Sequence, residues 1–397
     1  MTSLETRRKQ AKKVWQALQD SERPVIYIGA GSCGLAAGAA EVIEAIEGYL
    51  KKNGRRADIL RVGCIGPCYL EPLVDVQMPG KPRVSYSNMS PSLVKGVLES
   101  FFEKGEPYKG RLVGHFGRNG NKEFPRFFDH PMLAAQTRVV LRNCGIIDPE
   151  NIDHYLAQDG YLGLERCLTM PWSDVLDEVK KSGLRGRGGA GFPTWRKWLV
   201  CRETESDRKY LICNADEGDP GAFMNRSLIE GDPHALLEGM LIAAYALGAA
   251  EGTIYIRAEY PLAIVRLKRA LESMREVGLL GDGILGSAFS FDIRIKEGAG
   301  AFVCGEETAL IASIEGKRGM PRTRPPFPAV SGLWGRPTVI NNVETLATLP
   351  NIMRRGAEWY SRFGTETSKG TKTFSLVGKV RRTGLIEVPL GMSLRRV

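Results

Sequence analysis

The sequence lacks an apolar run long enough to cross a membrane. Its longest apolar segment, residues 235–250, is 16 residues long and includes Glu238, whereas a membrane-spanning helix needs about 20 apolar residues. Residues 1–20 contain five Lys and Arg but not the apolar core of a secretory signal. We therefore expect a cytoplasmic protein that does not insert directly into a membrane.

The sequence also lacks clusters of basic residues, tandem repeats and a disulfide framework. The formal net charge is +10, from 55 Lys and Arg against 45 Asp and Glu, yet no run of six basic residues occurs. Such a charge suits an anionic partner such as a nucleotide cofactor, and its even spread argues against nucleic acid. Eight cysteines in 397 residues do not form the disulfide scaffold of a small secreted domain.

Glycine, in contrast, is concentrated in residues 183–191, where five of nine positions are glycine and two are arginine. Glycine lets the backbone approach a bound group closely, and successive N–H groups can converge on an anion. Phe192 and Trp198 follow directly and could present flat surfaces beside this glycine loop. The stretch predicts a site for a phosphate-bearing cofactor with a ring system, and a flexible surface loop is the alternative.

Two further motifs support such a site. Asn214, Asp216 and Glu217 follow a predicted buried strand at residues 210–213, and α/β proteins bind ligands at the carboxyl ends of strands. A turn with helix caps is the alternative for this motif. A second glycine-rich turn, within residues 298–310, places two adjacent glutamates at a helix start. The helix dipole favours acids there in any case.

Two segments closer to the C-terminus complete the pattern. Residues 322–328 form a stiff basic segment with one aromatic residue. Asn341 and Asn342 stand at the start of a predicted helix. The two asparagines either cap that helix or reach a phosphate through its N-terminus.

Hydrophobic patterning predicts that the first ~105 residues form a small α/β unit after an amphipathic surface helix. The element order β-α-β-β-β-α is thioredoxin-like. The predicted strands and helices are residues 25–29, 35–50, 57–62, 73–78, 84–86 and 91–102. Ser90 and Pro91 form a typical start for the last of these helices.

The remaining chain predicts a second α/β unit and a short β-rich end. Strands alternate with helices after a helix-rich approach, which is typical of βαβ units. The predicted elements are the helix-rich segment 131–182, strands at 210–213, 253–257 and 291–295, helices at 232–248 and 261–277, and strand-like runs at 374–377 and 385–388.

Together the motifs resemble the flavin- and NADH-binding subunit of respiratory complex I, the 51 kDa family. This family includes the diaphorase subunits of NAD-linked hydrogenases and formate dehydrogenases. The similarity covers roughly residues 124–349, with the motifs in the family's order. It implies an NADH-oxidising enzyme subunit that binds FMN and passes electrons to Fe–S centres of a multisubunit complex. A docking subunit that keeps the fold without flavin is the alternative.

The resemblance implies cofactor contacts at the matching positions. Those expected to contact FMN are Gly186, Arg187, Gly188, Lys197, Asn214, Asp216, Glu217, Phe302, Gly305, Glu306, Glu307, Asn341 and Asn342. Those expected to contact NADH are Phe192, Asp219, Arg324 and Phe327, with Glu307 also on the nicotinamide side. No catalytic side chain is expected, because the cofactor carries the hydride chemistry. Phe302 and Asp219 replace the family's common Tyr and Glu, and we expect these changes to tune nucleotide affinity.

The resemblance also implies four parts of the chain. These are a thioredoxin-like domain at residues 1–105, a linker at 106–130, the FMN/NADH-binding domain at 131–365 and the start of a ubiquitin-like β domain at 366–397. An N-terminal thioredoxin-like extension is typical of the hydrogenase and formate dehydrogenase branch.

The iron–sulfur ligands depart from the family pattern. No cysteine set for the family's [4Fe–4S] cluster follows Cys304. Cys33, Cys64 and Cys68 match three of the four ligands of a thioredoxin-like [2Fe–2S] site, and Ile28 stands at the fourth position. Because such clusters take four ligands, a degenerate docking domain with three remaining thiols is favoured over a bound cluster. The fold should still bring these thiols together, and Fe–S-containing partner subunits would then accept the electrons.

Overall fold

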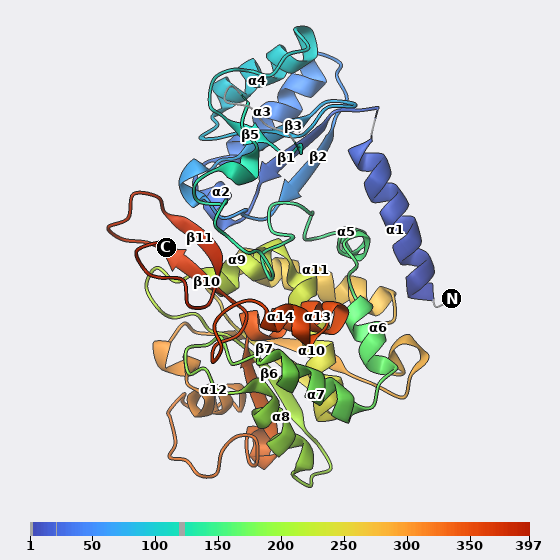
Figure 1. The fold of residues 1–397 in the computed structure, drawn as a ribbon, viewed down its shortest axis with the longest axis vertical. Helices are drawn as coiled ribbons and strands as arrows, with labels where there is room; N and C mark the ends of the chain where they lie inside the picture. The colour runs from blue at the N-terminus through green and yellow to red at the C-terminus, as the bar shows by residue number, and fades with distance from the viewer. Residues whose placement is uncertain (1–2, 21, 119–123) are drawn as a thin grey trace.

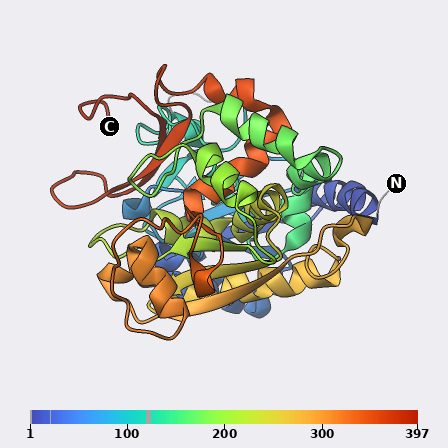
Figure 2. The ribbon, with the colours of Figure 1, turned by 90° about the horizontal axis from the view of Figure 1, so that it is seen from below.

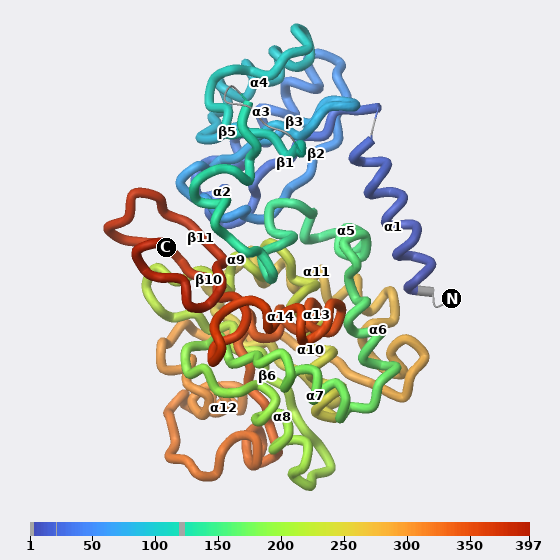
Figure 3. Tube along the Cα trace, viewed as in Figure 1, coloured from blue at the N-terminus to red at the C-terminus, as the bar shows by residue number. Residues whose placement is uncertain are grey.

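The computed structural model describes residues 3–20, 22–118 and 124–397. It contains two α/β units, with the N-terminal unit at the top of Figure 1 and the larger unit below it. The tube in Figure 3 follows the chain from one unit into the other through the segment that precedes α5. No helix among the described residues is both long and apolar enough to span a bilayer.

The N-terminal unit is built on a five-stranded sheet in the order β2-β1-β3-β4-β5. β1 and β2 run parallel, and the other neighbours are antiparallel. The strands are β1 (Val25–Gly29), β2 (Asp58–Val62), β3 (Val74–Gln77), β4 (Val84–Tyr86) and β5 (Leu112–His115). This arrangement confirms the predicted thioredoxin-like fold class.

Alternation of side chains along β1 explains how this sheet is covered. Ile26 and Ile28 pack among apolar residues of α3 (Ala39–Lys52) and α4 (Pro91–Glu103). Val25 and Tyr27 point to the opposite face, where Leu18 of α1 (Ser3–Gln19) packs against them. Both faces of β1 are therefore buried, and α1 covers the second face.

Two details of this unit differ from the sequence predictions. The helix predicted at 35–50 is divided into α2 (Ser32–Ala36) and α3, because Gly38 between them adopts a left-handed φ of 102°. β5 was not predicted. It lies inside the segment 106–130, which was expected to be a linker, and it pairs with β4. Residues 119–123 of that expected linker lie outside the described residues.

The larger unit is built on a parallel four-stranded sheet in the order β8-β7-β6-β9. The strands are β6 (Tyr210–Ala215), β7 (Glu251–Arg257), β8 (Asp292–Gly298) and β9 (Thr338–Asn342). The helices are α5 (Ile152–Ala157), α6 (Leu162–Leu168), α7 (Trp172–Ser182), α8 (Thr194–Glu203), α9 (Met224–Gly231), α10 (Pro233–Leu247), α11 (Pro261–Glu276), α12 (Glu307–Ile314), α13 (Val343–Arg355) and α14 (Ala357–Ser361).

Helices cover both faces of this parallel sheet, as such sheets require. Leu211 and Cys213 of β6 belong to the large core that includes α10 and α13. Ile212 of the same strand faces the other way, into a smaller core with Leu310 and Ile311 of α12. The βαβ organisation predicted from the alternating pattern is therefore confirmed.

The C-terminal segment forms an antiparallel hairpin of β10 (Thr371–Leu376) and β11 (Gly384–Pro389). Figures 1 and 2 place this hairpin and α1 on opposite sides of the molecule. The buried Glu387 carboxylate accepts N–H groups of Val139, Val140 and Leu141. Leu385 N–H binds Gly66 O at 2.8 Å, so the hairpin contacts both units. Its assignment to a ubiquitin-like domain stays a prediction.

Candidate functional site

A pocket in the described part of the chain lies at the carboxyl ends of β6 and β9. Its volume is about 680 Å³, within the range of cofactor sites. The two strands are parallel, with Asn214 opposite Asn342, so their ends meet at one edge of the sheet. The pocket is lined by Gly186, Gly188, Ala190, Gly191, Phe192, Thr194, Arg196, Lys197, Val200, Asn214, Gly305, Glu306, Glu307, Arg324, Phe327, Pro328, Ala329, Val330, Thr338, Ile340, Asn341, Asn342 and Thr345.

The glycine loop forms one wall of this pocket and is a closed structure. It connects α7 to α8, and Gly186 N–H binds Phe192 O at 2.9 Å across its neck. Gly188 passes so close to β9 that an added Cβ would lie 3.3 Å from Cβ of Asn342. Gly189 has a φ of 111°, which only glycine adopts without strain. The alternative of a flexible surface loop therefore does not describe this segment.

Three asparagines at the strand ends have fixed orientations. Asn341 Oδ1 accepts Trp198 Nε1–H at 2.9 Å, and Asn214 Nδ2–H donates to Gly305 O at 2.9 Å. Asn342 Oδ1 caps α13 by accepting Glu344 N–H at 2.9 Å. Asn342 is therefore a helix cap that also lines the pocket, and contact of the Asn pair with a phosphate stays a prediction.

A charged group stands in the same pocket. The Lys197 ammonium pairs with the Glu307 carboxylate and also donates to Ile340 O at 3.1 Å. Arg324 Nη1 approaches Glu307 Oε2 to 3.4 Å from the opposite side. One carboxylate thus lies between two cations at the mouth of a glycine-lined pocket, which suits a ligand with anionic and hydrogen-bonding groups.

Glu306, next to this charged group, is the N-cap of α12. Its carboxylate accepts Thr308 N–H at 2.8 Å and Ala309 N–H at 3.0 Å. Burial acts to raise the pKa of Glu306, but these hydrogen bonds outweigh it and lower the pKa overall. Glu306 is therefore held ionised, and its first role is to start the helix that positions Glu307.

Two exposed aromatic rings stand at the pocket. Phe192 is 46% exposed and Phe327 is 57% exposed, and both line the pocket although they come from segments far apart in the sequence. Exposed rings beside a pocket are suited to stack on a planar ligand. These two residues were predicted to contact NADH, and their position is compatible with that prediction.

Five predicted contact residues do not line the pocket. Asp219 lies on an exposed loop, and the Phe302 side chain is 68% exposed. Asp216 is half-buried, and its raised pKa results from burial. Glu217 is buried and accepts N–H groups of Asn225 and Arg226, so it caps α9. Their roles in cofactor binding stay predictions, as does that of Arg187.

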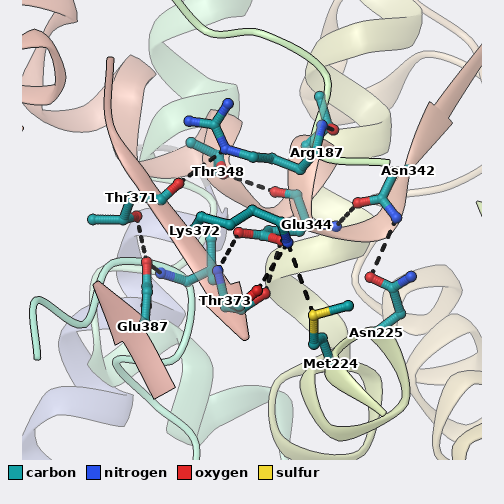
Figure 4. A network of polar contacts seen from close by, with 12 residues as sticks. Arg187, Met224, Asn225, Asn342, Glu344, Thr348, Thr371, Lys372, Thr373 and Glu387 are labelled. Atoms are coloured by element: carbon teal, nitrogen blue, oxygen red, sulfur yellow. Dashed lines mark hydrogen bonds and ion pairs between the residues drawn. The ribbon is translucent and has the colours of Figure 1, made fainter. Parts of the chain in front are cut away.

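The Arg187 side chain points away from the pocket. It is only 6% exposed, and Nε donates to Thr371 O at 2.9 Å. Its Nη groups donate to Tyr360 Oη, Lys369 O and Arg185 O at 2.7–2.8 Å. Figure 4 shows Arg187 above the start of β10. Arg187 therefore fastens the glycine loop to the C-terminal hairpin.

Replacement of Arg187 by Met should destabilise the fold. The change removes four hydrogen bonds of a buried cation and leaves three carbonyl oxygens and the Tyr360 hydroxyl without this donor. We expect this to lower the free energy of unfolding by about 3 kcal/mol. Urea denaturation followed by circular dichroism measures this. Arg185→Met is the control, because Arg185 is exposed and its loss should cost less than about 1 kcal/mol. Equal stability of the two variants would contradict the role of Arg187.

Several residues that line the pocket were not predicted from the sequence, and Thr345 and Arg196 are two of them. Thr345 Oγ1 accepts Arg187 N–H at 2.9 Å and so holds the glycine loop against α13. Arg196 adds a cation beside Lys197 on α8. The only sequence signal that Thr345 belongs to the site was its place in the first helical turn after the asparagine pair. The only such signal for Arg196 was its position next to Lys197.

A second cluster lies in the N-terminal unit, where Cys33, Cys64 and Cys68 come together. Their sulfur atoms all lie within 4.8 Å of one another, which confirms that the fold brings these thiols together. Hydrogen bonds with Cys64 and Cys68 lower the pKa of the Cys33 thiol. Ile28, at the fourth predicted position, is a fully buried apolar residue of β1. The donor set therefore does not supply the four cysteines of a [2Fe–2S] cluster.

Comparisons with known proteins agree with the site. Residues 179–351 match the model of the Nuo51 FMN-binding domain. The chain is 62% identical over 262 residues to the NADP-reducing hydrogenase subunit HndC of Solidesulfovibrio fructosivorans, which covers 66% of this chain and 53% of that protein. It is 51% identical over 269 residues to an NADH-quinone oxidoreductase subunit of Aquifex aeolicus, covering 67% of this chain and 63% of that protein.

A solved structure is similar across nearly the whole chain. The crystal structure of an NAD+-reducing [NiFe]-hydrogenase in the air-oxidized state superposes with a TM-score of 0.56 at 28% identity, covering 99% of this chain and 68% of that chain. The chain spans about half the length of HndC. The matched segment contains the glycine loop, the strand ends and the asparagine pair. Residues 179–351 of the chain thus match the Nuo51 FMN-binding domain, the 51 kDa-type family that these motifs predict.

Proposed function

We propose that this chain is the NADH-oxidising flavoprotein subunit of a multisubunit oxidoreductase. The observation that carries this proposal is the joint placement of the glycine loop and the Lys197–Glu307–Arg324 group in one pocket. Bound FMN would accept hydride from NADH and release electrons one at a time. The protein's own contribution is therefore to bind, to orient and to set the local charge.

The pocket residues divide naturally between the two ligands. Backbone N–H groups of the glycine loop and the N-terminus of α13, capped by Asn342, suit the FMN phosphate. Lys197 and Asn214 are fixed by Ile340 O and Gly305 O, so they can donate without reorganising. Phe192 and Phe327 stand where rings of NADH can stack, and Arg324 can pair with its phosphates.

The chain's partners follow from the relatives rather than from this chain's own residues. The similar proteins are named as subunits of NADH-quinone oxidoreductases and of hydrogenases. We therefore propose Fe–S-containing partner subunits as the electron acceptors. The thiol cluster with Ile28 lacks one cysteine of a [2Fe–2S] site. We also propose that the chain acts in the cytoplasm, where its partners could attach it to a membrane complex.

The proposal predicts that the purified chain, reconstituted with FMN, binds one flavin per chain and reduces ferricyanide with NADH. Flavin absorbance after gel filtration measures the first result, and ferricyanide reduction with NADH and with NADPH measures the second. The Lys197→Met variant tests the pocket, because it removes the cation held by Glu307 and Ile340 O. It should lower ferricyanide reduction by about 100-fold, since a half-buried charged group that donates hydrogen bonds in the pocket is worth about 3 kcal/mol. A well-folded chain that binds no FMN would instead be the docking subunit without flavin.

A further inference from the structure

The thiol cluster of the N-terminal unit is separate from the flavin pocket and has its own geometry. Cys33 lies in α2, Cys64 follows β2, and Cys68 begins the short helical turn 68–70. The Cys68 sulfur is 3.4 Å from that of Cys33 and 3.6 Å from that of Cys64. Three segments of the N-terminal unit therefore bring their thiols together.

These sulfur separations fit a single metal ion. Tetrahedral Zn²⁺ with Zn–S bonds of about 2.3 Å places two sulfur ligands about 3.8 Å apart, close to the 3.4 and 3.6 Å observed. A two-iron cluster divides its four ligands between two metals, so thiols bound to different irons lie farther apart than thiols that share one ion. Three thiols gathered within 4.8 Å match one shared ion.

The buried carboxyl group of Glu71 lies near the thiols, although it is not among the ligand atoms that lie within 4.8 Å of one another. Glu71 follows Cys68 by three residues and is only 5% exposed. Its Oε2 accepts Leu73 N–H at 2.8 Å, whereas Oε1 is buried and has no hydrogen-bond partner among the described residues. A buried, unpaired carboxylate oxygen is costly unless a proton or a cation compensates it.

Glycine keeps the space around this carboxylate open. A Cβ added to Gly29 would lie 2.5 Å from Glu71 Oε2, and one added to Gly34 would lie 3.2 Å from the same atom. Gly29 directly follows Ile28, the position at which a cysteine ligand is missing. A side chain at either glycine would therefore crowd the Glu71 carboxyl group.

We propose that Cys33, Cys64 and Cys68 bind one thiophilic divalent cation of the Zn²⁺ class in place of a two-iron cluster, and that the Glu71 side chain turns toward the ion as its fourth ligand. The ion would displace the thiol protons on binding and would carry no redox chemistry. It would fix α2, whose Ser32 N–H and hydroxyl both donate to Glu230 of α9 at 2.8 and 2.5 Å. The site would thus stabilise the contact between the two units, and this inference does not depend on flavin binding.

Metal analysis of the full chain, purified anaerobically with a reductant, tests the proposal. We expect one zinc per chain and, after replacement by Co²⁺, sulfur-to-cobalt charge transfer with the intense visible bands of a tetrahedral ion. Cys64→Ala should lose the metal. Cys167→Ala is the matched control, because Cys167 is equally buried but lies in α6 outside the cluster, and it should keep the metal.

Glu71→Gln tests the fourth ligand separately. It keeps the size of the side chain, and we expect zinc affinity to fall by about tenfold or more, measured by competition with a chelator. Glu230→Gln is the control, because Glu230 is a buried carboxylate that binds α2 through Ser32 and is not a proposed ligand. Two irons with two acid-labile sulfides per chain, or no stoichiometric metal at micromolar zinc, would overturn the proposal. Unchanged affinity in Glu71→Gln would remove Glu71 from it.

Discussion

Replacement of Gly188 by Val is expected to abolish retention of FMN while the chain stays folded. The Cβ alone would stand 3.3 Å from Asn342 Cβ, and the two methyl groups of valine would occupy the pocket wall beyond it. The glycine loop would have to move away from β9. Loss of two charge-assisted hydrogen bonds to a phosphate costs about 3 kcal/mol or more, which is at least about 100-fold in affinity.

Fluorescence quenching of free FMN, titrated with the purified variant, measures this loss. Gly48→Val is the matched control, because Gly48 lies in α3 and a Cβ there meets nothing within 4 Å. This control should bind FMN as the unaltered chain does. If Gly188→Val binds FMN with undiminished affinity, the glycine loop is not the phosphate site, and the flavin assignment of the pocket fails with it.

Local signals were sufficient to predict most of this fold. Asp232 caps α10 by accepting Ala235 N–H at 3.2 Å, and Gly248 ends that helix with a left-handed φ of 70°, as their residue types indicate. The alternating strands and helices also predicted the parallel sheet. Each of these features depends on neighbours within a few residues, so a sequence contains the information needed to recognise it.

The features that were missed depend on contacts between distant residues. Arg187 was predicted as a flavin contact because it stands in the glycine loop, yet its Nε binds Thr371 O, 184 residues away. Glu71 was not predicted as a site residue, because nothing in its local sequence indicates that it is buried near three thiols. β5 contains only four residues and becomes a strand because β4 offers an unpaired edge. Tertiary packing determined all three outcomes.

The site itself was predicted in outline from the family resemblance and the motif spacing. Glycine loop, strand ends and the second glycine-rich turn do meet in one pocket. The ion pair between Lys197 and Glu307 was not predicted, since the two residues belong to different motifs. It joins the motif of α8 to that of α12, and it makes Glu307 the residue whose charge the pocket depends on most directly.

Replacement of Glu307 by Lys is therefore expected to reduce NADH oxidation strongly. The new ammonium would lie between Lys197 and Arg324, so three cations would face one another where one carboxylate now joins two. Like charges about 4 Å apart repel by roughly 4 kcal/mol near a protein surface. The Glu307 side chain is 27% exposed, so solvent reduces this figure, and we expect kcat/KM for NADH to fall on the order of 100-fold.

Stopped-flow reduction of the bound flavin by NADH, together with the flavin content, separates the two effects of this change. If Glu307 acts on the nicotinamide side, the variant should retain FMN and lose its reduction by NADH. Glu307→Gln, which removes the charge without reversing it, should fall between the variant and the unaltered chain. Glu297→Lys is the control, because it makes the same charge change at Glu297 of β8, which forms an exposed pair with Lys268. This control should leave the rate within about twofold, because surface changes cost less than about 0.5 kcal/mol. Normal NADH oxidation by Glu307→Lys would mean that this carboxylate does not face the reacting ligand, and that the charged group serves only to hold α8 against α12.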